Sequence, residues 1–211
     1  MSKYAVLLEK AAPHTDLATP ELPSAKAASP VSGQRAFAEL AAKLFSTTDS
    51  GRVVAFVSAT HGEGVTRTVS GLAAELARSS KTVLSLDGSL HGSPAAGMRG
   101  LDDSLRIDPI ILGAPNLVEA ETASTLIASL RQRYDAILLD CGSLESSSDL
   151  LRLAPLSDWV LLVVEAGRTG KIQIDRAARV ISEAGGTLAG CVLNKRRYPV
   201  PNWLYRLLQA R

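Results

Sequence analysis

The chain has 211 residues, of which 46% are hydrophobic, 21% charged and 4% aromatic, which is typical of one ordinary globular domain. Its 23 basic and 21 acidic residues give a net charge of +2, so no strong overall field favours nucleic acid or anionic lipid. No run reaches the ~18 apolar residues of a membrane-spanning helix, and the first residues lack the pattern of a signal peptide. We therefore expect a cytoplasmic protein.

Residues 1–33 are expected to form a flexible N-terminal segment with a proline-rich linker. Residues 11–33 hold four of the ten prolines among Ala, Ser and Thr, a composition that buries little apolar surface. Residues 4–8 are apolar, and we expect them to fray rather than to dock as a helix. Residues 34–211 are predicted to be one domain that begins with an amphipathic helix over residues 34–45.

Apolar, β-branched runs alternate with helical patterns through this domain. Continuous apolar runs are typical of strands buried on both faces, and their alternation with helices requires parallel pairing. The predicted fold is an α/β three-layer sandwich with a mainly parallel sheet. The expected strands are 53–58, 82–87, 136–140, 159–165 and 188–194, and the expected helices are 66–78, 119–134, 148–153 and 171–184.

The remaining polar candidates carry less information. Cys141 and Cys191 lie in apolar runs and are expected to be buried free thiols. His14, His61 and His91 do not have the spacing of a metal site. Residues 199–211 predict a basic C-terminal helix that begins at Asn202, either packed on the sheet or in contact with a membrane.

A glycine-containing loop follows the first predicted strand and opens the next helix. Its sequence over residues 58–66 is Ser-Ala-Thr-His-Gly-Glu-Gly-Val-Thr. Glycines between a buried strand and a helix N-terminus form a nest of backbone N–H groups that suits an anion. Because ligands of such sheets bind at the carboxyl ends of the strands, this loop is the first candidate site.

The loop resembles the phosphate-binding loop of the bacterial tyrosine kinases of polysaccharide export, relatives of the partitioning and septum-placement ATPases. Seven of the nine positions fit the family pattern Ser-Ala-x-Pro-Gly-Glu-Gly-Lys-Thr, which implies a P-loop NTPase-like fold. His61 replaces the proline, and Val65 replaces the lysine that contacts the β- and γ-phosphates. The resemblance therefore implies ATP and Mg²⁺ as ligands, with binding weak or absent because valine carries no charge.

The ends of the later strands extend the resemblance. Asp87 fits the first acid of the family's Asp-x-Asp-x-Arg motif, whereas Ser89 and His91 replace its other two members. Asp140 falls on the Walker B aspartate, and Asn194 on the asparagine that reads adenine in relatives, where it is alternatively a cap of the strand end. Arg67 lies near the missing lysine, but helical geometry turns it away from Val65.

These matches define the candidate site by resemblance. Asp87 and Asp140 would be catalytic in an active protein, and Thr66 and Asp140 would hold Mg²⁺. The nucleotide-binding residues would be Gly62, Glu63, Gly64, Val65, Thr66, Arg67 and Asn194.

Two further departures bear on assembly. The first helix carries Arg35-x-x-Ala38-x-x-Ala41 where the family has Glu-x-x-Arg-x-x-Arg for contacts in a ring, so a ring oligomer is not expected. The C-terminal tyrosine cluster that such kinases phosphorylate is also missing, since only Tyr198 and Tyr205 follow the last strand.

The joint loss of these groups favours a degenerate, non-catalytic regulator of exopolysaccharide or capsule synthesis, recruited to the inner membrane. By resemblance, its partner would be the cytoplasmic part of a chain-length-determining membrane protein or an intact kinase paralogue, and no nucleic acid partner is expected. One alternative is an active ATP-binding tyrosine kinase or ATPase. Another is a partitioning-type positioning protein that binds membrane or DNA through its basic tail.

Overall fold

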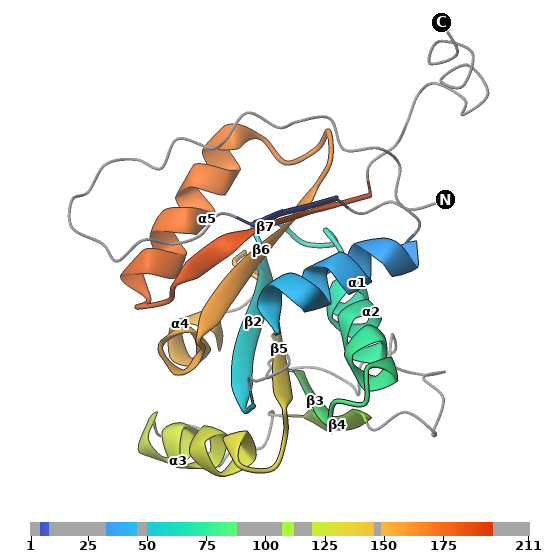
Figure 1. The fold of residues 1–211 in the computed structure, drawn as a ribbon. Coiled ribbons are helices and arrows are strands. Elements are labelled where there is room, and N and C mark those ends of the chain that lie inside the picture. The colour runs from blue at the N-terminus through green and yellow to red at the C-terminus, as the bar shows by residue number, and fades with distance from the viewer. Residues whose placement is uncertain are drawn as a thin grey trace, which may run out of the picture.

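The computed structural model describes residues 5–8, 33–45, 50–87, 107–111, 120–145 and 149–195. These residues form a central sheet with helices on both sides (Figure 1). The strands are β1 (Ala5–Leu8), β2 (Arg52–Ser58), β3 (Val83–Asp87), β4 (Ile107–Ile111), β5 (Ala136–Ser143), β6 (Trp159–Glu165) and β7 (Leu188–Asn194). The helices are α1 (Gly33–Leu44), α2 (Val65–Arg78), α3 (Ala120–Arg131), α4 (Asp149–Leu153) and α5 (Lys171–Glu183), with a 3₁₀ turn at Ala154–Leu156.

The sheet has the strand order β1-β7-β6-β2-β5-β3-β4. All described pairs are parallel except the one between β1 and β7, which is antiparallel. Among the described connections, α2 lies between β2 and β3, α3 between β4 and β5, α4 between β5 and β6, and α5 between β6 and β7, as parallel strands require. The predicted α/β fold with a mainly parallel sheet is confirmed.

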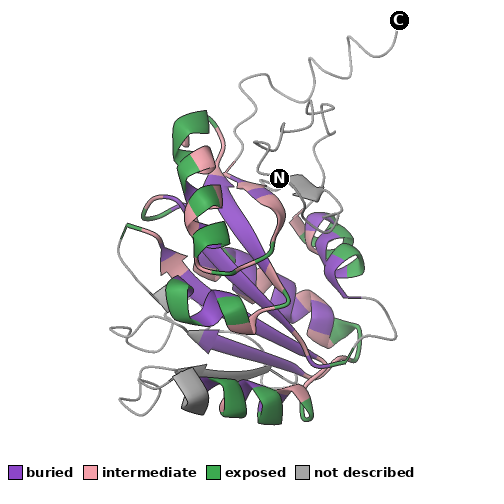
Figure 2. Cartoon of the chain, turned by 90° about the vertical axis from the view of Figure 1, so that its left-hand side faces the viewer, coloured by how far each residue is buried: buried purple, intermediate pink, exposed green. Residues whose placement is uncertain are grey.

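Two hydrophobic clusters hold the three layers together. One contains buried side chains of α3, α4 and α5 against one face of the sheet, and the other contains those of α1 and α2 against the opposite face. The strands are buried between them, whereas the outer sides of the helices are exposed (Figure 2). Since both faces are covered, the strands are apolar throughout, which is the pattern seen in the sequence.

The five predicted strands and the five helices predicted between residues 34 and 184 are all present, and the structure adds β1 and β4. The expectation that residues 5–8 fray is wrong, because they pair with residues 190–193 of β7. β4 escapes prediction because Asp108 and Pro109 interrupt its apolar pattern. Proline is tolerated there because β4 lies at the edge of the sheet. The linker and the expected C-terminal helix lie outside the described residues.

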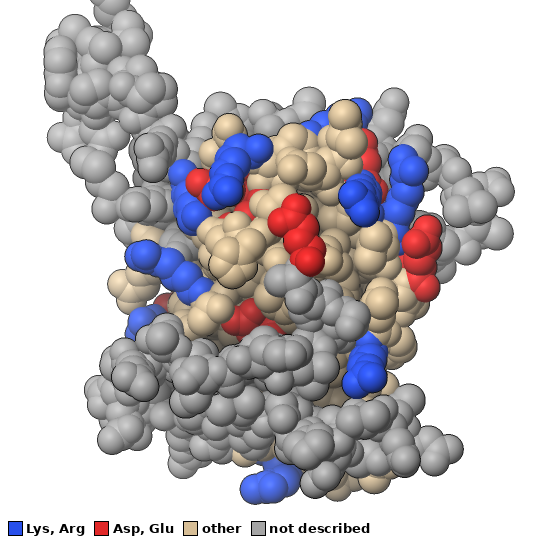
Figure 3. Space-filling model, turned by 180° about the vertical axis from the view of Figure 1, so that it is seen from behind, with Lys and Arg blue, Asp and Glu red and all other residues tan. Residues whose placement is uncertain are grey.

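The described part of the chain contains no helix with the length and apolar character that a bilayer crossing needs. On the face shown in Figure 3, basic and acidic side chains of the described residues are interspersed, which agrees with the small net charge. Cys141 is buried and Cys191 half-buried, both as free thiols. Burial raises the pKa of Cys191 to about 11.

Candidate functional site

The candidate phosphate loop connects β2 to α2 at the carboxyl edge of the sheet. Gly62 and Gly64 both have positive φ angles, +81° and +98°, which only glycine adopts without strain. Among the described residues, the N–H groups from Gly62 to Arg67 have no acceptor. Together with the N-terminus of α2, they form a nest of free donors of the kind that binds anions.

Val65 is the first residue of α2. It is only 5% exposed and belongs to the hydrophobic cluster beneath α1 and α2. Arg67 lies two residues later in the same turn of α2 and is exposed, whereas Val65 is buried. The loop therefore presents backbone donors, whereas the side chain of Val65 is apolar and part of the core.

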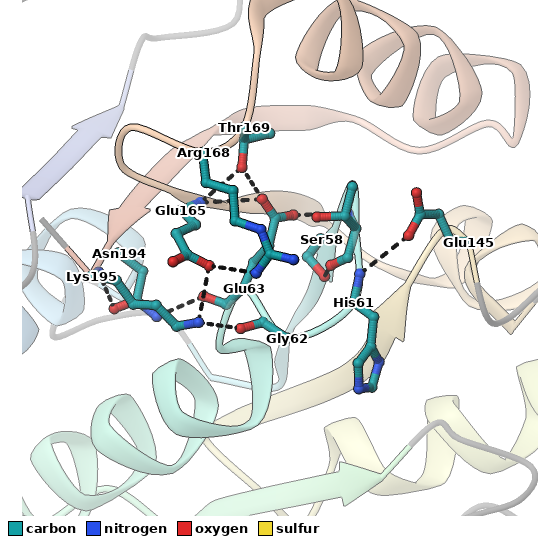
Figure 4. A network of polar contacts seen from close by, with 11 residues as sticks. Ser58, His61, Gly62, Glu63, Glu145, Glu165, Arg168, Thr169, Asn194 and Lys195 are labelled. Carbon is teal, nitrogen blue, oxygen red and sulfur yellow. Dashed lines mark hydrogen bonds and ion pairs between the residues drawn. The ribbon is translucent and has the colours of Figure 1, made fainter.

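Glu63 is completely buried, and its carboxylate accepts three hydrogen bonds (Figure 4). Its Oε2 accepts the N–H of Thr60 at 2.9 Å. Its Oε1 accepts the N–H of Glu165 at 3.2 Å and the hydroxyl of Thr169. The sequence places Glu63 among the nucleotide-binding residues, and the structure commits its side chain to the loop between β6 and α5.

Asn194 ends β7 and binds the phosphate loop from the other side. Its Nδ2 donates to the carbonyl of Glu63 at 2.8 Å, and its Oδ1 accepts the N–H of Lys195 at 2.7 Å. The side chain is buried, at 2% exposure for the residue. In this structure Asn194 acts as a cap of the strand end and a support of the loop.

Lys195 is the cation that lies against the phosphate loop. Its Nζ donates to the carbonyl of Gly62 and forms an ion pair with Glu165 at 3.0 Å, and Arg168 contacts the same carboxylate at 3.2 Å. The hydrogen bond from Lys195, opposed by desolvation and aided by Arg168, lowers the pKa of Glu165 from its ordinary 4.5. Glu165 therefore stays ionised and holds both cations at the outer rim of the loop.

The two candidate aspartates lie on adjacent strands. Asp87 and Asp140 are register partners in β3 and β5, so the structure brings these strand ends together, although the side chain of Asp87 lies outside the description. Asp140 is 7% exposed and its Oδ1 accepts the N–H of Gly142 at 3.1 Å. Thr66 lies in the first turn of α2, partly exposed beside the free N–H groups.

Three further residues contribute to the site without having been assigned a role from the sequence. Glu165 is the last residue of β6, Thr169 lies four residues later, and Lys195 directly follows β7. Their position at strand ends was the only signal in the sequence. His61, in contrast, is exposed, with its N–H 3.4 Å from a carboxylate oxygen of Glu145.

Two acidic residues lie at the opposite edge of the sheet, before the strands β5 and β6 begin. Asp158 precedes β6, accepts the N–H of Val53 at 2.7 Å and forms a bidentate ion pair with Arg131 at 2.7 and 3.0 Å. Asp135 precedes β5 and accepts both the N–H and the hydroxyl of Thr82 at 2.8 Å. These residues join elements of the fold and do not belong to the phosphate site.

No protein-family model matches the chain. In sequence, it is 28% identical over 79 residues to CapB of Staphylococcus aureus, whose name assigns it to the tyrosine-protein kinases, across 37% of this chain and 35% of CapB. It is 22% identical over 172 residues to the tyrosine-protein kinase CpsD of Streptococcus agalactiae, across 68% of this chain and 75% of CpsD.

Comparison with solved structures also finds tyrosine kinases, and the similarity extends over more of the chain. The kinase domain of the Escherichia coli tyrosine kinase ETK superposes with a TM-score of 0.65 at 20% identity, across 81% of this chain and 79% of that domain. The chain therefore has the P-loop α/β fold of this kinase domain. The chimerical protein CapA2B2 matches the chain with a TM-score of 0.68 at 18% identity, across 81% of this chain and 87% of the chimera.

The chain is also related in fold to the cell division ATPase MinD. The MinD structure from Pyrococcus furiosus matches with a TM-score of 0.52 at 20% identity, across 67% of this chain and 70% of MinD. The predicted relation to the septum-placement ATPases is thereby confirmed at the level of the fold.

Proposed function

We propose that this kinase-type domain is a non-catalytic regulator in capsule or exopolysaccharide synthesis. Its partner would be the cytoplasmic part of a chain-length-determining membrane protein or an intact kinase paralogue, which would recruit it to the inner membrane. The likeness to CpsD and to the ETK kinase domain supports the pathway, and the likeness to the CapA2B2 chimera supports a membrane partner of this class.

The observation that carries the non-catalytic part is the burial of Val65. A hydrogen bond from a charged donor contributes ~1.5–3 kcal/mol, and losing a comparable donor to a transition state slows a reaction by ~10²–10³. Val65 supplies neither, because its side chain is apolar and packed in the core. Lys195 is held at the outer rim by Glu165 and by the Gly62 carbonyl, so it does not replace the lost lysine without breaking those contacts.

The remaining groups still fit a nucleotide in part. The free N–H groups from Gly62 to Arg67 suit phosphate oxygens, while Thr66 and Asp140 offer the hydroxyl and carboxylate oxygens that Mg²⁺ prefers. Bound ATP would supply a transferable phosphoryl group. MinD from Pyrococcus horikoshii was solved with Mg-ADP. We therefore expect residual binding by the backbone that is far weaker than in a lysine-containing loop.

Calorimetry with Mg-ATP and Mg-ADP at high protein concentration tests this proposal. Weak or undetectable binding supports it, and micromolar affinity for Mg-ATP contradicts it. A parallel assay for phosphate release and tyrosine phosphorylation should show no turnover above a protein-free blank.

The intact backbone nest and the retained Asp140 favour one second candidate, an active but unorthodox kinase or ATPase. Replacement Asp140→Asn separates the two. It abolishes turnover if the protein is an enzyme, whereas a regulator has no turnover to lose and keeps its affinity for the membrane partner.

A further inference from the structure

The most unusual group of the candidate site is the buried carboxylate of Glu63. Acidic side chains are almost never fully buried unless they are paired, yet Glu63 has 0% exposure. Its described partners, the N–H groups of Thr60 and Glu165 and the hydroxyl of Thr169, are all neutral donors. Three hydrogen bonds thus compensate for the burial of this group.

These bonds join two loops that are far apart in the sequence. One carboxylate oxygen closes the phosphate loop on Thr60, three residues earlier, and the other reaches Glu165 and Thr169, more than a hundred residues later. The carbonyl of the same residue accepts Asn194 Nδ2. Glu63 is therefore held from β6 and β7 at once (Figure 4).

We propose that Glu63 is a positioning residue that keeps the phosphate loop in its anion-binding conformation without a nucleotide, and that Thr169 transmits this restraint between the loop and residues 165–170. The free N–H groups from Gly62 to Arg67 then stay aligned because the protein's own groups bind the rest of the loop. This inference goes beyond the proposed function, since it concerns the ligand-free loop and holds for a regulator and an enzyme alike.

The donor pattern makes the replacement Glu63→Gln informative. An amide has one oxygen and one NH₂ group, and the side chain meets an N–H donor at each end. With the NH₂ group toward Thr60, the hydrogen bond from the Thr60 N–H is lost. With the NH₂ group toward Glu165, the N–H of Glu165 loses residue 63 as an acceptor but keeps the hydroxyl oxygen of Thr169, which it contacts at 3.1 Å. The replacement Thr169→Val removes the hydroxyl, which donates to Glu63 and accepts the N–H of Glu165, and Thr169→Ser restores it.

Amide hydrogen exchange, followed residue by residue by NMR on the nucleotide-free protein, tests the proposal. We expect Glu63→Gln to accelerate exchange at Thr60 by roughly tenfold or more, the size expected for a hydrogen bond to a charged group, and to affect Glu165 less, because its N–H keeps the Thr169 oxygen as an acceptor. Thr169→Val should accelerate exchange at Thr60 although the two residues do not touch, and Thr169→Ser should return it to the wild-type rate. Glu183→Gln, a change of the same chemistry at an exposed carboxylate, is the matched control.

The decisive comparison is between Thr169→Val and Thr169→Ser at Thr60. If Thr169→Val changes exchange only within residues 165–170, or if serine fails to restore the rate at Thr60, the positioning role is overturned. Because Thr169 is partly exposed, its variants remain informative even if Glu63→Gln does not fold. No nucleotide or partner is present in this experiment, so its failure is distinguishable from failure of the proposed function.

Discussion

At the carboxyl edge of the sheet, the side chain of Asn194 occupies the place where a side chain on Gly64 would lie. A Cβ atom on Gly64 would lie 2.2 Å from the Nδ2 of Asn194, which is the atom that supports the phosphate loop. The glycine of the loop and the asparagine of β7 therefore depend on each other sterically, in addition to their separate places in the family pattern.

This relationship predicts the effect of Gly64→Ala. The residue has φ +98° and no room for a methyl group, so we expect a loss of at least ~1–3 kcal/mol in the free energy of unfolding. Gly62→Ala is the matched control, because Gly62 has φ +81° but nothing within 4 Å of the added atom. Urea denaturation should show the larger loss for Gly64→Ala, and equal losses would contradict the steric account.

A second prediction concerns the charge missing from the loop. Val65→Lys restores the cation, and a charged hydrogen bond of ~1.5–3 kcal/mol corresponds to a gain in Mg-ATP affinity of about tenfold to a hundredfold. Val65→Met, which lengthens the side chain without charge, should leave affinity unchanged in the same calorimetric titration. Equal affinities of the two variants for Mg-ATP would show that the missing side-chain charge is not the reason for weak nucleotide binding.

The ion pair at the opposite edge predicts a stability effect. Asp158→Ala removes the acceptor of the buried Val53 N–H and the bidentate partner of Arg131, and we expect unfolding to become easier by about 1–3 kcal/mol. Arg35→Ala serves as the control, since its pair with Glu39 is exposed and contributes less than about 0.5 kcal/mol. If Asp158→Ala lowers the free energy of unfolding no more than Arg35→Ala does, Asp158 does not stabilise the fold as we predict.

Asp135 predicts a pH dependence. Its hydrogen bonds from Thr82, the backbone N–H first, lower its pKa from the ordinary 3.8. The group therefore stabilises the fold above that value, and this contribution is lost as the pH falls from about 3.8 through the lower folded value. The stability difference between wild type and Asp135→Asn should be constant at neutral pH and shrink in this acid range. A stability difference that grows as the pH falls would contradict the predicted lowering of the Asp135 pKa in the folded protein.

The elements of the fold were largely predictable because their signals are local. Buried parallel strands require continuous apolar runs, and the runs that end at Ser58, Asp140 and Asn194 could be recognised from the sequence alone. β1 could not be predicted, because four apolar residues form a strand only when another strand, here β7, has an edge available for pairing. β4 was missed because Pro109 is acceptable only at an edge, and edge position is a property of the whole sheet.

Some features of the candidate site could likewise be predicted from the sequence, and others could not. The phosphate loop and the exposure of Arg67 followed from spacing and helical geometry. The direction of the Glu63 side chain did not, because it is set by donors more than a hundred residues later in the chain. Lys195 directly follows Asn194 in the sequence, but the sequence reveals neither its positive φ of 55° nor the contact of its Nζ with the Gly62 carbonyl.

The short strand β1 also has a consequence for how the molecule behaves in concentrated solution. It lies at the border of the sheet and pairs with β7, whose N–H and C=O groups would otherwise be open to strands of other molecules. Residues 5–8 therefore act as an internal competitor against strand exchange between copies. Displacement of these four residues would first appear as self-association, while the parallel strands and their helices stay folded.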